Sequence, residues 1–424
     1  MKKFHKTLSA TLGLGMALTG SSAFAVDSDL EQLQEQVRQL IAQNQQLSKR
    51  VAAMEQERPA QPEPIRAGGI SSSPVPEELL RTKVQQQVLK EIRRQQEAEG
   101  KSQQINDYVT LFGLIEAEAV VGDDFAGDAA SEFNVATVEL GFDAQLSDWV
   151  VGHILAKYEG GEEDQHLFID EANIWLGNYQ KFPVLLTAGK FYLPFGQFDT
   201  NMVQDPLTLE VGEINAPGLA IGVEQHGFTG ALYSYKGMNE TDGNDTIKGF
   251  GAMLSYHHEI DETRVDAGAS WVSNLADSGG ISDAFDGAGL DSIIDQVPGF
   301  GVYLTAGYGP FSLISEYIQA IDPFAPSELD FKGEGAQPKA WNAELAYATA
   351  LLGKETIFAV GYQGTAEALA LELPYARYMG AVSMVLFEGT SLTLEYFHDS
   401  DYDEDEGGSG EDADVFTAQL AYEF

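Results

Sequence analysis

The chain has 424 residues, with 24 Lys and Arg against 66 Asp and Glu, so its formal net charge is −42. A surface this negative repels nucleic acid and excludes a DNA- or RNA-binding role. The absence of cysteine excludes a disulfide framework, a thiolate metal site and a cysteine nucleophile.

Residues 1–25 have the pattern of a signal peptide. Lysines precede a short apolar stretch, and Ala23-Phe24-Ala25 has the small-x-small form of a cleavage site. We therefore expect an exported protein. No later apolar run reaches the ~20 residues that a membrane helix needs, so any membrane contact must be made by strands.

Residues 26–58 carry a heptad repeat with an asparagine at one a position. This narrow apolar seam favours a coiled coil over an amphipathic helix lying on a core, and we expect a parallel homotrimer or homodimer. The residues expected to make this contact are Leu33, Val37, Leu40, Asn44, Leu47 and Val51.

Two further segments lead toward the rest of the chain. Five prolines mark residues 59–76 as a stiff linker. A helix is expected within residues 77–106. Its apolar stripe consists of Leu80, Val84, Val88 and Ile92.

Residues 107–424 alternate between apolar and polar side chains, which is the period of a β-strand. Val265 and Ala267, for example, alternate with Arg264 and Asp266. About sixteen such segments follow one another, joined alternately by short turns and by longer loops rich in Gly, Asp or Pro. This asymmetry predicts an outer-membrane barrel, because a soluble β-sandwich has no reason to maintain it. The longer loops are expected around residues 122–132, 159–165, 192–217, 236–246, 276–299, 321–338, 364–374 and 399–414.

Several segments carry a family resemblance. They are DEANIWLG at residues 170–177, AGKFYLPFGQFDTNMVQDPLTLEVGEI at residues 188–214, the N-terminal heptads, and the final strand, which ends on Phe424. A closing amphipathic strand that ends on Phe resembles the assembly signal of outer-membrane barrels. Together these segments resemble the siderophore porins related to the legiobactin receptor. The resemblance implies uptake of an iron chelate through a barrel without a separate plug domain.

The motif GKFYLPFGQF at residues 189–198 is also shared loosely with phosphate-selective porins. Phosphate selectivity needs a ladder of basic residues along the pore, whereas residues 107–424 hold two Arg and eight Lys against 54 acids. We reject phosphate for this reason. The same field favours a neutral or cationic chelate, or a free cation.

The third loop of general porins often folds inward, so we expect residues 192–217 to narrow the pore; the alternative is a loop that stays outside a wide channel. Acidic rings select cations. The expected constriction residues are Asp199, Asp205, Glu210 and Glu213. The expected pore-wall residues are Glu116, Glu118, Glu139, Asp143, Glu171, Arg264, Asp266, Glu344, Arg377 and Glu395.

No catalytic motif stands out, so neither an enzyme nor a cofactor is expected. His257 and His258 are adjacent on a strand and would face opposite sides, which disfavours a shared metal. The acidic loop near the C-terminus lacks the glycine of a calcium-binding EF-hand. Its weak hard-cation candidates are Asp399, Asp401, Asp403 and Asp405.

The leading hypothesis is an outer-membrane porin for small solutes, with its N-terminal arm in the periplasm and ferric siderophore as the substrate implied by the resemblance. One alternative is a structural tether that links the barrel to the cell wall or to a periplasmic partner through the coiled coil. Another is a general cation-selective porin. The longer loops hold 35 acids and two lysines, which suits either a cation funnel or adaptation to salt.

Overall fold

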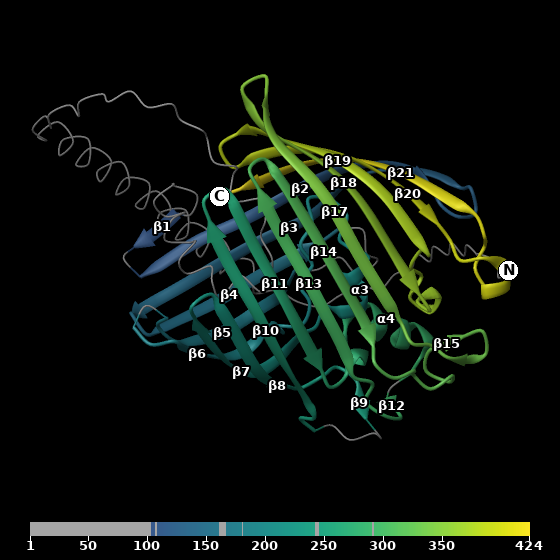
Figure 1. Cartoon of the computed structure of the whole chain (residues 1–424), viewed down its shortest axis with the longest axis horizontal. Helices are drawn as coiled ribbons and strands as arrows, with labels where there is room; N and C mark the ends of the chain where they lie inside the picture. Colours follow the sequence, from purple (N-terminus) through teal and green to yellow (C-terminus); the bar gives the residue numbers. More distant parts are fainter. Residues whose placement is uncertain (1–102, 107, 161–166, 180, 242–245, 291) are drawn as a thin grey trace, which may run out of the picture. The chain divides into compact units, whose positions relative to one another are not determined.

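The computed structural model describes residues 103–106, 108–160, 167–179, 181–241, 246–290 and 292–424. Within them, sixteen antiparallel strands close into a barrel, because β2 pairs with both β3 and β21 (Figure 1). The barrel strands are β2 (Val109–Asp123), β3 (Ala129–Ser147), β4 (Val150–Glu159), β5 (Leu167–Gly177), β6 (Val184–Tyr192), β7 (Asn215–Gln225), β8 (Phe228–Tyr235), β10 (Gly249–Ile260), β11 (Thr263–Val272), β13 (Gly299–Tyr308), β14 (Phe311–Ala320), β17 (Lys339–Leu351), β18 (Lys354–Ala366), β19 (Ala376–Phe387), β20 (Thr390–Ser400) and β21 (Asp412–Glu423). The expected antiparallel barrel is confirmed.

The barrel sheet also includes the short strand β1 (Gln103–Asn106), which pairs antiparallel with the start of β2. The domain boundaries expected before residue 103 lie outside the described residues.

Turn length alternates around the barrel as expected. The turns 148–149, 178–183, 226–227, 261–262, 309–310, 352–353 and 388–389 gather at one end, here called the turn end, and the longer loops lie at the opposite loop end (Figure 1). At 226–227, His226 and Gly227 both have positive φ, 54° and 79°, which is the geometry that matches strand twist in a two-residue hairpin.

The longer loops contain the remaining elements of the described chain. These are α3 (Leu207–Gly212), β9 (Glu240–Thr241), η3 (Leu275–Asp277), α4 (Gly279–Ala288), β12 (Ser292–Ile293), β15 (Asp330–Phe331), β16 (Glu334–Gly335), η4 (Leu369–Leu371) and η5 (Glu404–Glu406). No helix in the described part of the chain combines the length and the apolar character needed to cross a membrane.

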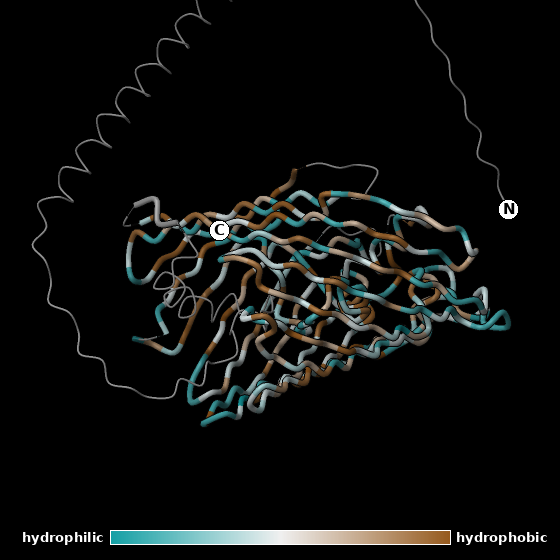
Figure 2. Tube along the Cα trace, turned by 90° about the horizontal axis from the view of Figure 1, so that it is seen from above, coloured by the Kyte–Doolittle hydropathy of each residue, from teal (hydrophilic) through white to brown (hydrophobic). Residues whose placement is uncertain are grey.

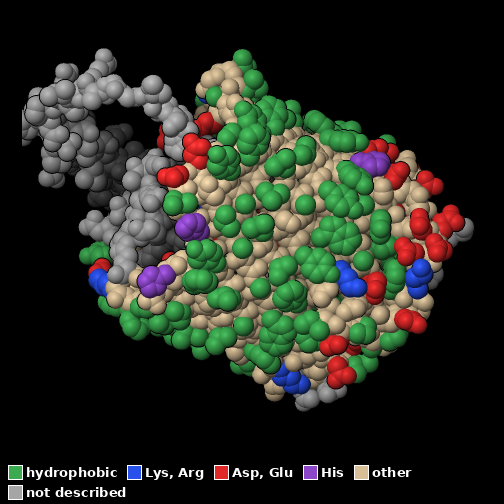
Figure 3. Space-filling view, in the orientation of Figure 1, with side chains coloured by type: hydrophobic (Ala, Val, Ile, Leu, Met, Phe, Trp, Pro, Cys, Tyr) green, Lys and Arg blue, Asp and Glu red, His purple; other side chains and the backbone are tan. Residues whose placement is uncertain are grey.

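Successive side chains along each strand point alternately to the outer and the inner face of the barrel wall. On β17, Leu345 is 51% exposed on the outer face, whereas the neighbouring Glu344 is 1% exposed on the inner face. Figure 2 shows hydrophobic and hydrophilic positions following each other along the strands. In Figure 3, apolar side chains spread over the strand region, and Asp and Glu gather toward the loop end. This is the face pattern of a membrane barrel.

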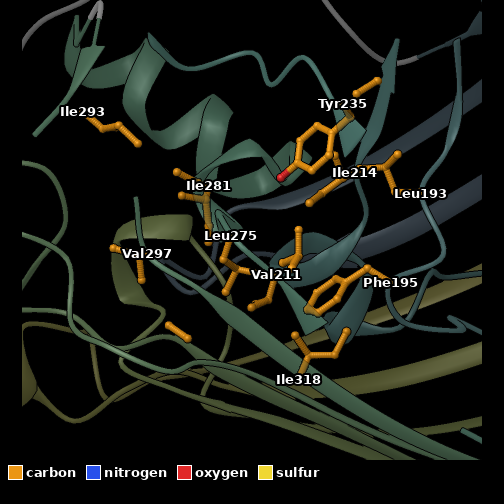
Figure 4. Packing of buried hydrophobic residues seen from close by; sticks show 14 of the residues in the cluster. Leu193, Phe195, Val211, Ile214, Tyr235, Leu275, Ile281, Ile293, Val297 and Ile318 are labelled. Atoms are coloured by element: carbon orange, nitrogen blue, oxygen red, sulfur yellow. The ribbon is translucent and has the colours of Figure 1, made fainter. Parts of the chain in front are cut away.

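The largest apolar core lies inside the barrel. It joins residues of the loop 193–214 and of the loop 273–298 to inward residues of β8, β11, β14 and β17, including Phe195, Val211, Leu275 and Ile318 (Figure 4). These loops therefore form a packed layer against the inner wall.

Candidate pore constriction

The loop between β6 and β7, residues 193–214, follows the inner wall of the barrel. A Cβ added at Gly212 of α3 would lie 2.5 Å from Cδ1 of Ile318 on β14, so the helix lies directly on the wall. Phe195 and Val211 are fully buried in the same core. The loop thus occupies the lumen on this side.

Glu316 of β14 binds the loop near its start. Its carboxylate accepts hydrogen bonds from the backbone N–H groups of Gln197 at 2.5 Å and Phe198 at 3.1 Å. The hydroxyl of Thr208 donates a third bond at 2.7 Å. Glu316 is 4% exposed, so these bonds replace the water that the carboxylate would otherwise need.

Glu344 of β17 binds the next part of the loop. It accepts hydrogen bonds from the hydroxyl of Thr200 at 2.6 Å and from the backbone N–H of Asn201 at 2.9 Å. The side-chain amide of Asn342, on the same inner face, adds a bond at 3.2 Å.

Glu395 of β20 binds the segment that follows. It accepts from the backbone N–H groups of Val203 at 2.5 Å and Gln204 at 3.1 Å. The backbone N–H of Leu207 then donates to Oε1 of Gln363 on β18 at 3.0 Å. The inner wall therefore holds the loop over much of its length by its backbone.

These contacts change the roles expected for two pore-wall residues. Glu344 and Glu395 do face inward, but the loop covers both, and each is only 1% exposed. They border the loop and do not line an open channel, because the loop's N–H groups are their partners.

Asp199 also differs from its expected place at the constriction. It points toward the wall, where it accepts hydrogen bonds from Thr305 at 3.3 Å and Gln197 at 3.4 Å. Burial, followed by the charges of Glu316 and Asp266, raises the pKa of Asp199 well above its ordinary value despite these bonds.

Asp205 has the opposite environment. It is exposed, and it directly follows Gln204, whose backbone N–H donates to Glu395 at 3.1 Å. Glu210 and Glu213, on and beside α3, are half-buried, and the backbone carbonyl of Glu213 accepts from the N–H of Gly279 at 3.0 Å. Of the expected constriction residues, Asp205 is the one that the structure leaves exposed.

The inner faces of β2 and β3 are also acidic. Glu116, Glu118 and Glu139 are half-buried on the inner faces of β2 and β3. Gln419 of β21 donates to Glu118 at 2.9 Å.

Nearer the turn end, two other expected wall acids are buried. Asp143 lies 2.7 Å from Nδ1 of His153, whose ring stacks between Phe112 and Trp175. Glu171, 1% exposed, lies on β5 beside this group.

The inward basic residues are bound to acids. Arg377 forms two bonds to Asp399, at 2.7 and 2.8 Å, and Arg264 lies 3.5 Å from Glu259. Lys157 pairs with Glu159 at 2.5 Å. Their charge is therefore neutralised locally and cannot offset the exposed carboxylates.

Asp266, another expected wall residue, has partners on the same wall. The hydroxyl of Tyr303 donates to it at 2.9 Å, and His257 lies 3.4 Å away. His258, on the other face of β10, contacts Tyr256, so the two histidines are separated as expected from strand geometry.

The candidate hard-cation aspartates have separate partners. Asp399 binds Arg377, Asp401 accepts from the backbone and hydroxyl of Ser409 at 2.6 Å, and Asp405 lies 4.0 Å from Lys332. Among the described residues, no group of three or more His, Asp or Glu side chains is arranged to hold a metal ion.

The coiled-coil residues Leu33, Val37, Leu40, Asn44, Leu47 and Val51 lie outside the described residues. Conversely, the sequence reasoning overlooked Glu316, Gln363 and Thr208. Alternation along β14 already placed Glu316 on the inner face of an apolar strand, which was the available signal.

Comparisons with known proteins agree with this architecture. No protein-family model matches the chain. It is 30% identical over 303 residues to the UPF0422 protein of Coxiella burnetii, covering 69% of this chain and 64% of that protein. It is 29% identical over 318 residues to a UPF0422 protein of Legionella pneumophila strain Lens, covering 69% and 59%. The chain thus spans about three fifths of the length of these relatives.

Solved structures show the same fold at low identity. An anion-selective porin from Comamonas acidovorans has a TM-score of 0.52 at 12% identity, covering 74% of this chain and 99% of that one. The outer membrane channel DcaP of Acinetobacter baumannii has a TM-score of 0.51 at 14% identity, covering 74% and 97%. The chain is therefore similar in sequence to UPF0422 proteins, and its barrel has the fold of outer-membrane porins.

Proposed function

We propose that this protein is an outer-membrane porin that passes small solutes and favours cations. The observation that carries the proposal is that Asp205 is an exposed carboxylate on a loop bound to the inner wall, inside a barrel whose β2 and β3 also carry inward acids such as Glu116. Because Lys157 and Arg377 are already paired with acids, the exposed carboxylates keep an excess of negative charge. Such a ring attracts cations and repels anions.

The charge of the longer loops also supports a preference for cations. The longer loops carry many acids and few lysines, so cations would be concentrated before they reach the lumen. The Comamonas porin is anion-selective by its name, but a likeness at 12% identity concerns the fold and not the charge of the lumen.

Purified full-length protein in planar bilayers tests the proposal. We expect stepwise conductance and, in a potassium chloride gradient, a reversal potential that shows preference for potassium. Absence of conductance would contradict the porin function, and preference for chloride would contradict the cation selectivity.

Within this function, the substrate we propose is a ferric siderophore, on the strength of the resemblance carried by residues 170–177 and 188–214. The negative lumen favours a neutral or cationic chelate over an anionic one. Deletion of the gene should abolish growth on at least one defined iron chelate and leave growth on the others intact. Unchanged growth on every chelate would remove the siderophore from the proposal.

A second candidate is a tether, supported by the heptads of residues 26–58. In that case the barrel acts mainly as an anchor, and the coiled coil binds the cell wall or a periplasmic partner. A protein that does not conduct but co-purifies with peptidoglycan only when residues 26–58 are present would favour the tether.

A further inference from the structure

The inner wall meets the loop 193–214 in a regular pattern. The backbone N–H groups of residues 197 and 198 donate to Glu316, that of residue 201 to Glu344, and those of residues 203 and 204 to Glu395. Successive wall carboxylates thus bind the loop at intervals of about three residues. Because these donors are backbone groups, the bonds do not depend on which side chains the loop carries.

We infer that Glu316, Glu344 and Glu395 are positioning residues, which hold the loop against the inner wall and so fix the place of the exposed Asp205 in the lumen; the inference rests on the porin function proposed above. The contact at Glu395 ends at Gln204, directly before Asp205. Removing this carboxylate should therefore displace Asp205 most, because Val203 and Gln204 are the bound residues nearest to Asp205 in the chain. Glu316 binds the loop farther away on both sides, at Gln197 and Phe198 and at the hydroxyl of Thr208.

The negative charge of the wall carboxylates strengthens their hydrogen bonds to the loop. A hydrogen bond to an ionised carboxylate is shorter and stronger than one between neutral groups. In each case one buried carboxylate receives at least two loop donors, so its loss removes the partner of several loop groups at once. Arg377, the basic residue near Glu395, has only donors and is itself bound to Asp399, so it cannot accept the loop's N–H groups in place of Glu395.

Apolar side chains also hold the loop against the wall, next to these hydrogen bonds. Met202 of the loop lies in a buried cluster with Ala359 of β18 and Met379 of β19. Ala359 is 4% exposed, and it can become accessible from the lumen when the loop leaves the wall.

A cysteine at this position reports the loop directly, because the chain has no cysteine of its own. Ala359→Cys in the full-length protein, reconstituted in vesicles, should react slowly with a membrane-impermeant thiol reagent. Adding Glu395→Ala or Glu344→Ala should raise the labelling rate by roughly tenfold or more, because each change removes at least two charge-assisted bonds. In bilayers, Glu395→Ala should bring the potassium-to-chloride permeability ratio closer to one than either Glu344→Ala or Glu316→Ala.

Glu118→Ala is the matched control, since it removes one lumen carboxylate that binds Gln419 and not the loop. It should shift selectivity while leaving the introduced thiol of the Ala359→Cys protein protected. Equal labelling in the control and in Glu395→Ala, or unchanged protection in both Glu344→Ala and Glu395→Ala, would overturn the inference.

Two further measurements keep the test interpretable. Heat-modifiable migration on gels shows that each variant has a folded barrel, and Glu395→Gln, which retains one acceptor oxygen, should give intermediate labelling. Labelling does not depend on conductance. A wild type that fails to conduct would therefore contradict the porin function, while the labelling series still decides the role of the wall carboxylates.

Discussion

Two aspartates of one loop show how residue environment separates roles that look alike in the sequence. Asp199 and Asp205 both belong to the segment 193–214, which lacks Lys and Arg. Asp199 is buried against the wall beside Thr305, whereas Asp205 is exposed. An exposed charge acts on a passing ion at closer range than a buried one, so the proposed cation selectivity points to Asp205 and not to Asp199.

The first prediction compares these two residues in the same assay. Asp205→Asn should lower the potassium-to-chloride permeability ratio by roughly two- to threefold, because one of several solvated carboxylates is lost. Asp199→Asn should leave the ratio within error of wild type. Reversal potentials in a potassium chloride gradient measure both. A larger effect from Asp199→Asn would reverse the assignment.

The second prediction concerns pH. Because burial raises the pKa of Asp199, its carboxyl binds a proton more readily in the docked loop than in the unfolded chain, where the ordinary value of 3.8 applies. Ionisation therefore disfavours the docked loop, and this penalty grows as pH rises through the raised pKa. Asp199→Asn should increase heat resistance at neutral pH, and the gain should vanish below about pH 4. A gain that persists at low pH would point to a different cause.

At the scale of elements, α3 and α4 form a second packed layer inside the barrel. Phe285 of α4 is fully buried and meets Phe324 of the loop 321–338 edge-on, with ring centroids 5.8 Å apart. Ile281 is buried in the same core (Figure 4). This layer is held by side-chain packing among three loops, whereas the strands are joined by backbone hydrogen bonds, so we expect the two to open separately.

The third prediction follows from that separation. Phe285→Ala should cost roughly 3–5 kcal/mol locally, through lost burial and the cavity left behind. Hydrogen exchange should accelerate across residues 275–290 and remain slow in β13 and β14. Uniform acceleration through the barrel strands would show that loop core and barrel unfold as one unit.

At the scale of the whole molecule, charge and periodicity divide the chain. Residues 107–424 carry 54 acids against ten basic residues, and the preceding heptad segment is nearly balanced. A periplasmic coiled coil would join barrels without placing their acidic loops against each other. This role of residues 26–58 remains a prediction.

The fourth prediction tests the arm alone. A peptide of residues 27–57 should form a helical trimer or dimer in analytical ultracentrifugation. Asn44→Val should raise its melting temperature and broaden its stoichiometry, because the buried amide specifies register at a cost in stability. A monomeric, unfolded peptide would contradict the oligomerisation role.

The sequence by itself determined the barrel, because its signals are local. Alternating residues such as Val265 and Asp266 must face lipid and lumen in turn, and turn length alternates because successive hairpins lie at opposite ends. The inward direction of Glu344 and Glu395 was also readable from this period.

Only the tertiary structure decided which inward carboxylates meet water and which meet the loop. Val203 and Glu395 are 192 residues apart in the chain, and Gln197 and Glu316 are 119 apart. No local pattern encodes such pairs, because they arise only when the strands close and bring β14, β17 and β20 against one loop. When the barrel closes around this loop, Asp199 is buried and Asp205 is left exposed, although both belong to the same acidic segment.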